Sequence, residues 1–454
     1  MTPHRRILSR PLPRATWIVA LALLAGCLGA AAGARAPALP PGMTPLPRGL
    51  ELRMRELVRA AEEYRGLRLK HPVLWGAVSE AELKKEVVTQ FRDDLPPAKL
   101  AALEASLKAF GLIPEMMDLE TYYPTLLSSQ IAGFYDSHRK VLAVVAHRGS
   151  LLGKDFDKQY GPAMVRRMED GLLVHELTHA LQDQHFDLNK LEAADPLSDA
   201  DAARLALVEG DASLTMFDSV THARAEDLPD NPEHLDMSSA LPGQGELAAA
   251  PAWLRESLIF SYEEGYAFCS SVRRRGGQRL LDYAFAADPP RSSEQILHPE
   301  KWYGSRDDPV VIVWPDLARE LPSYRQAAEG QLGEEGIRIL LRQALGDPER
   351  AAGAAAGWGG DRFAVYIQGG KRVLAWITDW DSPAAAERFH AAAGLAAVKG
   401  AAWSVKRPSS RRVTLVRGLA PDAQRAALET QLAAARAEPP ANHPIDSALL
   451  AGRP

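Results

Sequence analysis

Cysteine is scarce in this chain of 454 residues. There are two cysteines, Cys27 and Cys269, and we expect them to have different fates. Cys27 lies in an N-terminal segment that has the pattern of a targeting signal, so its lipidation or removal would leave Cys269 without an intramolecular partner. An internal disulfide is therefore excluded in the mature protein. Its stability must come from a hydrophobic core, for which a hydrophobic content of 46% is sufficient.

Several common motifs are also missing from the sequence. It contains no fixed-period repeat, no glycine-rich phosphate-binding loop, no dinucleotide-binding fingerprint and no serine nucleophile elbow. An excess of positive charge is missing as well. The formal net charge is −5, and loss of residues 1–26, which hold four Arg and no Asp or Glu, would change it to −9. A modestly acidic protein gives no support for a nucleic-acid partner.

Residues 1–27 have the pattern of an export signal. A basic stretch precedes an apolar run from Trp17 to Ala25, which is too short to span a bilayer as a mature helix. The run leads into Leu24-Ala25-Gly26-Cys27, which resembles the lipobox of bacterial lipoproteins, in which the Cys receives the lipid. The alternative is a secretory signal cleaved within residues 30–34. Both export the chain, and we expect a cell-envelope lipoprotein that meets the membrane only through a lipid anchor at Cys27.

The expected fold class is α+β and mainly helical, with two or three domains allowed by the length. Amphipathic, highly charged helices are predicted at 51–69, 79–91 and 97–110. Beyond residue 346, the order strand, strand, helix, strand, helix predicts a small α+β module. The expected organisation is a signal peptide at 1–27, a Pro/Ala-rich tether at 28–48, a helical lobe at 49–125, a central domain at 126–345, the α+β module at 346–438 and a tail at 439–454. The oligomeric state is not indicated.

The most informative stretch is an apolar run with helical period from Leu172 to Leu181. Its apolar residues form one helix face, and on the opposite side His175 and His179 stand one turn apart. Two imidazoles at this spacing can bind one Zn²⁺ ion, and the neighbouring carboxylate of Glu176 can accept a proton from a water molecule. The alternative is a surface helix that carries two histidines on its polar face.

A third ligand is predicted on the next helix, from Asp199 to about Met216. Its core-facing stripe holds one carboxylate, Glu209, in the centre. A buried carboxylate needs a cation or a full set of hydrogen bonds, and a Zn²⁺ ion held by the two histidines would be such a cation. The alternative is an ion pair with an Arg, or a helix turned so that Glu209 is exposed. Asp211 is a candidate acceptor for a ligand His N–H.

The two motifs together resemble those of the gluzincins, the clan of thermolysin-like zinc metallopeptidases. The resemblance rests on His175-Glu176-Leu177-Thr178-His179, 29 intervening residues and Glu209-Gly210-Asp211-Ala212, and it covers about residues 126–300. It implies a zincin-like domain in which His175, His179 and Glu209 bind Zn²⁺ and Glu176 is the general base. The second motif departs from the thermolysin pattern Asn-Glu-x-x-x-Asp. Gluzincins also supply a downstream His or Tyr to the oxyanion, and His298 is the candidate here, the alternative being a turn residue.

A β-hairpin is predicted just before the zinc-binding motif. Residues 131–136 and 141–145 are rich in β-branched and aromatic side chains, and a polar turn that includes His138 joins them. We interpret His138 as a turn residue, and His185, on another face of the motif helix, as structural. A strand at this place can bind an extended peptide by edge pairing.

These patterns favour a zinc metallopeptidase of the bacterial cell envelope that acts on a peptide or protein substrate. The alternative is a non-catalytic envelope lipoprotein in which a structural or degenerate zinc site supports a binding module. Two His and one Glu leave an open coordination position, whereas a structural zinc site is usually closed by four protein ligands. The ligand set therefore favours the enzyme.

Overall fold

The computed structural model describes most of the chain beyond the N-terminal segment. The expected signal peptide, Cys27 and residues 28–38 of the expected tether lie outside the described residues. Within the described residues, no helix is both long and apolar enough to cross a membrane. The described residues are 39–130, 133–145, 153–191, 195–225, 244–397, 403–419, 422–440 and 444–450.

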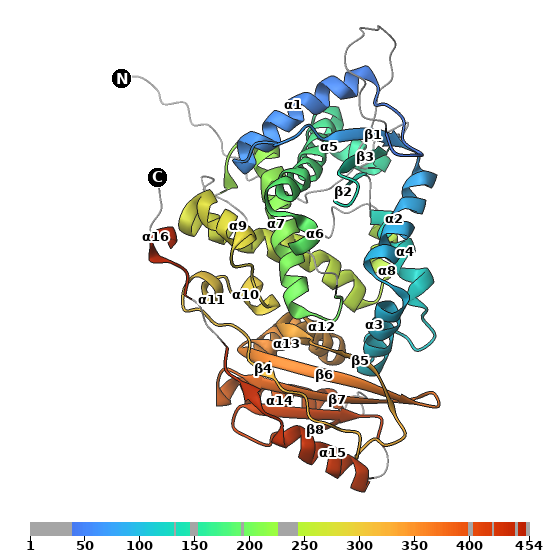
Figure 1. The fold of residues 1–454 in the computed structure, drawn as a ribbon, viewed down its shortest axis with the longest axis vertical. Coiled ribbons are helices and arrows are strands. Elements are labelled where there is room, and N and C mark those ends of the chain that lie inside the picture. The colour runs from blue at the N-terminus through green and yellow to red at the C-terminus, as the bar shows by residue number, and fades with distance from the viewer. Residues whose placement is uncertain are drawn as a thin grey trace.

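The fold is α+β and mainly helical, which confirms the predicted class. Figure 1 shows a helical body above a five-stranded sheet, with three helices of the N-terminal region along one side of the body. A small three-stranded sheet lies within the body, in the order β1-β3-β2, and the larger sheet has the order β5-β6-β7-β9-β8.

Four long helices form the body, and their apolar faces meet in one core. The helix with the His-Glu-x-x-His motif is α5, in which the predicted apolar stripe is at most 1% exposed at Leu173, Val174, Leu177, Ala180 and Leu181. A non-helical Gly161 divides α5, and Gly276 and Gly277 divide α9, so both of these long helices are kinked. The four helices are α1 (Arg48–Arg65), α5 (Gly153–Phe186), α7 (Asp199–Thr221) and α9 (Ala252–Ala286).

The N-terminal region contributes to two different parts of the structure. Its first helix, α1, packs on α5 and α7 in the body, while α3 packs on the large sheet. The strand β1, which the sequence analysis did not identify, pairs in parallel with β3 of the predicted hairpin. The hairpin itself is confirmed, since β2 and β3 pair antiparallel. These elements are β1 (Leu74–Val78), α2 (Glu80–Asp94), α3 (Pro97–Phe110), α4 (Leu119–Gln130), β2 (Gly133–Asp136) and β3 (Val141–Val145).

Side-chain caps start two of the predicted helices. The Ser79 hydroxyl accepts a hydrogen bond from the backbone N–H of Glu82 at the start of α2, and Ser198 accepts one from Asp201 at the start of α7. Both serines have the extended backbone of an N-cap residue, which satisfies one otherwise unpaired N–H of the first turn. The two serine caps therefore fix where α2 and α7 begin.

The large sheet packs helices on both faces. Phe363 and Val365 face α3, α12, α13 and α14, whereas the alternating residues Ala364 and Tyr366 face α15. The predicted strands and helices beyond residue 346 are present, but the sheet also includes β5, which precedes that residue. These elements are β5 (Arg325–Gly330), α12 (Gly333–Leu345), α13 (Pro348–Ala355), β6 (Trp358–Gln368), β7 (Lys371–Trp380), α14 (Pro383–Ala396), β8 (Trp403–Lys406), β9 (Arg412–Arg417) and α15 (Asp422–Ala434).

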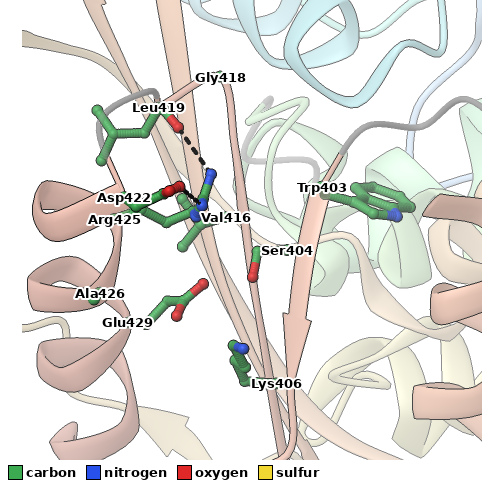
Figure 2. Close-up of a pocket in the computed structure, with 10 residues that line it drawn as sticks. All are labelled: Trp403, Ser404, Lys406, Val416, Gly418, Leu419, Asp422, Arg425, Ala426 and Glu429. Atoms are coloured by element: carbon green, nitrogen blue, oxygen red, sulfur yellow. Dashed lines mark hydrogen bonds and ion pairs between the residues drawn. The ribbon is translucent and has the colours of Figure 1, made fainter. Parts of the chain in front are cut away.

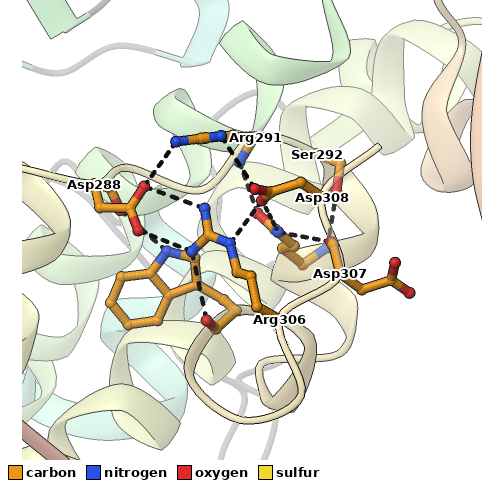
Figure 3. Close-up of polar contacts among 8 residues, drawn as sticks. Asp288, Arg291, Ser292, Arg306, Asp307 and Asp308 are labelled. Atoms are coloured by element: carbon orange, nitrogen blue, oxygen red, sulfur yellow. Dashed lines mark hydrogen bonds and ion pairs between the residues drawn. The ribbon is translucent and has the colours of Figure 1, made fainter. Parts of the chain in front are cut away.

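A network of ion pairs holds the segment that joins the body to the sheet. Arg306 contacts both Asp288 and Asp308, and Arg291 contacts the same two carboxylates (Figure 3). Both carboxylates and Arg306 are buried, so the network fixes the path of this segment. The remaining short elements are α6 (Leu188–Leu191), α8 (Gln244–Ala249), α10 (Ser293–Leu297), α11 (Glu300–Tyr303), β4 (Val311–Ile312), β10 (Ala437–Glu438) and α16 (Ser447–Leu450).

Candidate metal centre

The packing of α5 against α7 brings the three predicted ligands together. His175 and His179 project from the polar side of α5, and Glu209 projects from α7. One nitrogen or carboxylate oxygen from each of the three lies within 4.8 Å of the other two. The two histidines are almost fully buried and Glu209 is largely so. The buried apolar stripe of α5 therefore fixes the direction in which its histidines point.

The distances between the ligand atoms fit one tetrahedral ion. His175 Nε2 lies 3.0 Å from His179 Nε2 and 3.1 Å from Glu209 Oε2, and His179 Nε2 lies 3.6 Å from the same oxygen. A tetrahedral Zn²⁺ ion with bonds of about 2.0–2.1 Å would place neighbouring ligand atoms about 3.3 Å apart. Both contacts given for Glu209 are to histidines, so the alternative of an Arg partner for this carboxylate gains no support.

The start of the predicted core stripe of α7 is wrong. Ala206, Ala212 and Ser213 are buried, but Ala202 and Leu205 are exposed, Leu205 to 41%. The physical reason is that this part of α7 lines a groove, with Ala202 and Leu205 at its wall. Glu209 stands one turn after Leu205, at the end of the groove-facing stretch. The carboxylate of Glu209 therefore lies where the buried part of α7 meets the part that lines the groove.

Glu176 lies beside the ligands and is tied to the hairpin. Its Oε2 accepts a hydrogen bond of 2.8 Å from the backbone N–H of Tyr135 on β2. Burial raises the pKa of Glu176, and the neighbouring histidines oppose this effect. A carboxylate with a raised pKa, close to a metal site, suits the role of general base.

The charges of the metal-free cluster are strongly coupled. Burial alone would lower the pKa of His179, but the adjacent Glu209 carboxylate outweighs it and raises that pKa to about 10. Burial alone would raise the pKa of Glu209, and the charge of His179 reverses this, so the pKa of Glu209 falls. Without metal, the cluster therefore holds a carboxylate next to an imidazolium. Binding of a metal ion must displace the proton of His179.

The partner of His179 is Gln182, not Asp211 as the sequence suggested. Gln182 Oε1 lies 2.9 Å from His179 Nδ1, and Gln182 Nε2 donates to Asp211 Oδ2 and to the Val208 carbonyl at 2.8 and 3.0 Å. Asp211 therefore reaches the ligand only through the amide of Gln182. Because an amide oxygen can only accept, Nδ1 of His179 must carry the proton, and its Nε2 is free to bind metal.

The predicted oxyanion donor His298 is not part of the cluster. Its Nε2 lies 3.0 Å from Glu334 Oε1 of α12, and this hydrogen bond, more than the opposing effect of burial, raises the pKa of His298. Tyr262 of α9 lies beside the candidate ligands instead. Its ring stacks on that of His175, with centroids 6.1 Å apart and planes inclined by 25°. A downstream Tyr was the only sequence signal for this position.

The other two histidines singled out from the sequence have the expected roles. His138 is exposed in the hairpin turn, where its backbone N–H donates to Asp136. His185 contacts the Arg68 carbonyl through Nε2 at 2.8 Å, which joins α5 to the segment after α1. Neither belongs to the three-residue metal cluster.

An apolar groove of about 580 Å³ runs next to the metal cluster. It lies between the helices of the N-terminal region, the hairpin, α7, α9 and α12. Tyr135 links it to the cluster, because its ring lines the groove while its backbone N–H holds Glu176. Apolar and aromatic side chains from every one of these elements line the groove, among them Phe91, Leu103, Tyr123, Phe134, Leu205, Leu258, Leu332 and Ile339.

A second group of carboxylates surrounds the ammonium group of a lysine. Oxygens of Glu294, Asp307 and Asp381 lie within 4.8 Å of one another, a spacing that a metal ion can also produce. Lys301 Nζ, however, contacts them at 2.6, 2.8 and 2.6 Å. The three carboxylates therefore already share one partly buried cation, which joins the body to the end of β7.

A hollow of about 520 Å³ lies in the C-terminal part, between α15 and the strands β8 and β9 (Figure 2). Its charged residues have both signs: Lys406 and Arg425 face Asp422 and Glu429, and Arg425 pairs with Asp422. Within the described residues it contains no group of three metal-ligating side chains. The hollow shows no feature that selects a ligand of one charge.

The comparisons with known proteins found one match, which lies in the C-terminal part of the chain. No curated protein and no solved structure matches the chain. One family model matches residues 320–428, and that family is described as a domain of unknown function (DUF8575). The match begins before β5 and ends within α15, so it covers the whole five-stranded sheet and leaves the metal cluster outside.

Proposed function

We propose that the protein is a zinc-dependent peptidase that hydrolyses peptide or protein substrates in the bacterial cell envelope. One observation carries the proposal: two imidazoles and one carboxylate meet at the spacing of a tetrahedral ion, and a second carboxylate, Glu176, lies beside them. Three protein ligands leave a fourth position for water, as in catalytic zinc sites. The envelope location rests on the export signal read from the sequence.

Zn²⁺ in this site would supply Lewis-acid chemistry that activates a water molecule and polarises the substrate carbonyl. Glu176 would accept a proton from the attacking water and pass it to the leaving nitrogen. The hydrogen bond from the Tyr135 N–H holds the Oε2 of Glu176 in place for both steps. Gln182 keeps the proton of His179 on Nδ1, which leaves Nε2 as a ligand.

The substrate would lie along β2 and in the apolar groove. β2 is an edge strand of its sheet, and the N–H of Tyr135 turns its outer edge toward Glu176. An extended peptide can add to this edge through backbone groups other than the Tyr135 N–H, which Glu176 already occupies, and its side chains would lie in the adjacent groove. Because the groove lining is mainly apolar, we expect preference for large apolar side chains near the cleaved bond.

Tyr262 is the better-placed candidate for the donor that stabilises the oxyanion. Its ring lies against His175, whereas His298 is engaged by Glu334. An O–H donor close to the reacting carbonyl would act only where negative charge develops. His298 would then order the junction between α10 and α12.

The test is the pair Glu176→Gln and Asp170→Asn in the purified chain. Glu176→Gln should keep one equivalent of zinc and lose hydrolysis of a denatured protein mixture by roughly 10²- to 10⁴-fold. Asp170 is a partly exposed carboxylate on the same helix, and it pairs with Arg53. Asp170→Asn should therefore keep both the bound zinc and the hydrolysis. Hydrolysis by the unchanged chain should stop with a zinc chelator and return with added zinc. An unchanged rate in Glu176→Gln would refute the assignment.

The same assay separates the enzyme from a non-catalytic envelope lipoprotein. A structural zinc site would bind its ion and stabilise the fold, yet the chain would cleave no peptide under any zinc concentration. Chelation would then lower the melting temperature without any activity to lose. That result would favour a binding module, with the apolar groove as its binding surface.

A further inference from the structure

Arg65 is a fully buried cation at the end of α1, far from the metal motif in sequence. Its side chain is 1% exposed and lies beside the stacked rings of Phe186 and Phe285, with the guanidinium carbon 5.7 and 5.5 Å from their centroids. Its Nη1 donates to Asp282 at 2.7 Å. A charged side chain is buried at this cost only where strong partners hold it.

The second partner of Arg65 leads to the metal cluster. Arg65 Nε donates to Asp211 Oδ2 at 2.6 Å, and the same oxygen accepts from Gln182 Nε2 at 2.8 Å. The oxygen of that amide, Oε1, lies 2.9 Å from His179 Nδ1. Four buried side chains thus form an unbroken series from α1 to a metal ligand.

The direction of each hydrogen bond in the series is fixed by chemistry. Asp211 and the Val208 carbonyl can only accept, so they orient the Gln182 amide with its NH₂ group toward them. The amide oxygen must then face His179 and accept its Nδ1–H. If Asp211 were displaced, the amide would keep only the Val208 carbonyl as an acceptor, and the oxygen that sets the tautomer of His179 would be held less firmly.

Arg65 is what holds Asp211 in that position. The carboxylate is 1% exposed, and the guanidinium is the cation paired with it. Asp282 and the two phenyl rings restrain the guanidinium in turn, so Arg65 acts as a rigid support. We propose that Arg65 is a positioning residue for the metal centre, through which helix α1 sets the zinc affinity of His179. This inference rests on the proposed zinc site but not on hydrolysis.

The test measures Zn²⁺ affinity by competition with a chromophoric chelator and the visible spectrum of the Co²⁺-loaded chain. Gln182→Met, which keeps the length of the side chain but not its hydrogen bonds, should weaken zinc binding by roughly 10- to 100-fold. Arg65→Met should weaken it by a similar factor. Arg65→Lys should recover part of the loss, because an ammonium group can reach Asp211 but lacks the second arm of the fork.

The matched control is Arg53→Met. Arg53 also joins α1 to α5, through Asp170 and Glu169, but its contacts do not lead to Gln182. Its replacement should leave the zinc affinity within about twofold and the Co²⁺ spectrum unchanged. Equal losses in the Arg53 and Arg65 variants would mean general loosening of the helix and would overturn the proposal.

The decisive result is the double variant Arg65→Met/Gln182→Met. If Arg65 acts through Gln182, the double variant should bind zinc no more weakly than Gln182→Met alone. Additive losses of zinc affinity in the double variant would overturn the proposal. A zinc affinity of Arg65→Lys equal to that of the unchanged chain would overturn it as well. The Arg65→Lys variant also provides the test if Arg65→Met does not fold. An unchanged chain that binds zinc without hydrolysis would refute the peptidase but leave this inference standing. An unchanged chain that binds no zinc would overturn both.

Discussion

Gly210 and Gly265 lie in direct backbone contact where α7 crosses α9. A Cβ atom built on Gly210 would lie 2.1 Å from the backbone carbon of Gly265, and one built on Gly265 would lie 2.1 Å from the Ala206 carbonyl oxygen. Gly210 directly follows the ligand Glu209, and Gly265 is one turn after Tyr262. The close approach of the two helices therefore sets the positions of both residues relative to α5.

Gly210→Ala should separate α7 from α9 and shift Glu209. We expect a loss of about 1–3 kcal/mol or more in the free energy of unfolding, because the added methyl group meets backbone that cannot give way locally. Zinc affinity should fall as well. The control is Gly394→Ala in α14, where nothing lies within 4 Å. It should stabilise the chain by up to about 1 kcal/mol, since Ala favours helix over Gly. Urea unfolding measures the stability of the two variants, and zinc titration measures their zinc affinity. Equal changes in Gly210→Ala and Gly394→Ala would contradict this account of the contact.

Tyr262→Phe should separate binding from catalysis. Removal of one hydroxyl should lower kcat by roughly 10- to 100-fold while zinc content and KM stay close to those of the unchanged chain. His298→Gln keeps a hydrogen-bond donor toward Glu334, so its kcat should change by less than about threefold. Steady-state kinetics on one peptide compares the two variants. A large loss in His298→Gln with an active Tyr262→Phe would reverse the assignment in favour of the original prediction.

Lys301→Met should turn a filled carboxylate cluster into a cation site. Without the ammonium group, Glu294, Asp307 and Asp381 would face one another, and we expect a loss of about 1–3 kcal/mol in stability, since Glu294 is buried while the other two carboxylates are partly exposed. Millimolar Ca²⁺ should restore part of that loss, because three carboxylates at this spacing offer the oxygen ligands that it prefers. Thermal unfolding with and without Ca²⁺ tests this. If Ca²⁺ stabilised the unchanged chain by the same amount as Lys301→Met, this prediction would be wrong.

Asp199 should make the stability depend on pH. Burial raises its pKa to about 7 in the folded chain, well above the 3.8 of an exposed Asp. Between these values the folded state holds a proton that the unfolded state has lost, so stability should fall as the pH rises from about 4 to about 7. Asp199→Asn should flatten the slope in this range. Urea unfolding of metal-free protein at several pH values measures it, and identical slopes would exclude Asp199 as the source.

The parts of the site that follow from local sequence were predictable. The helical period around Leu173 and Leu177 fixed which way His175 and His179 point, and the central carboxylate of the next helix identified Glu209. Each of these predictions depends on the repeat of a single helix.

The parts that depend on distant packing were not predictable. Arg65 meets Asp211 across 146 positions, and no local pattern marks that pairing. The intervening Gln182 is the reason that Asp211 does not contact a ligand histidine directly. The role of Tyr262 depends on how α9 packs at Gly265, and β1 joins the hairpin through a parallel pairing. Such contacts are set by tertiary structure, which periodicity does not encode.

The most direct test of the account is the coordination of the metal in the purified chain, by X-ray absorption and anomalous diffraction. We predict one zinc ion bound to Nε2 of His175, Nε2 of His179 and a carboxylate oxygen of Glu209, with water in the fourth position. A chain that purifies without metal, a Glu209 oxygen beyond bonding distance, or a fourth ligand supplied by the protein would contradict it.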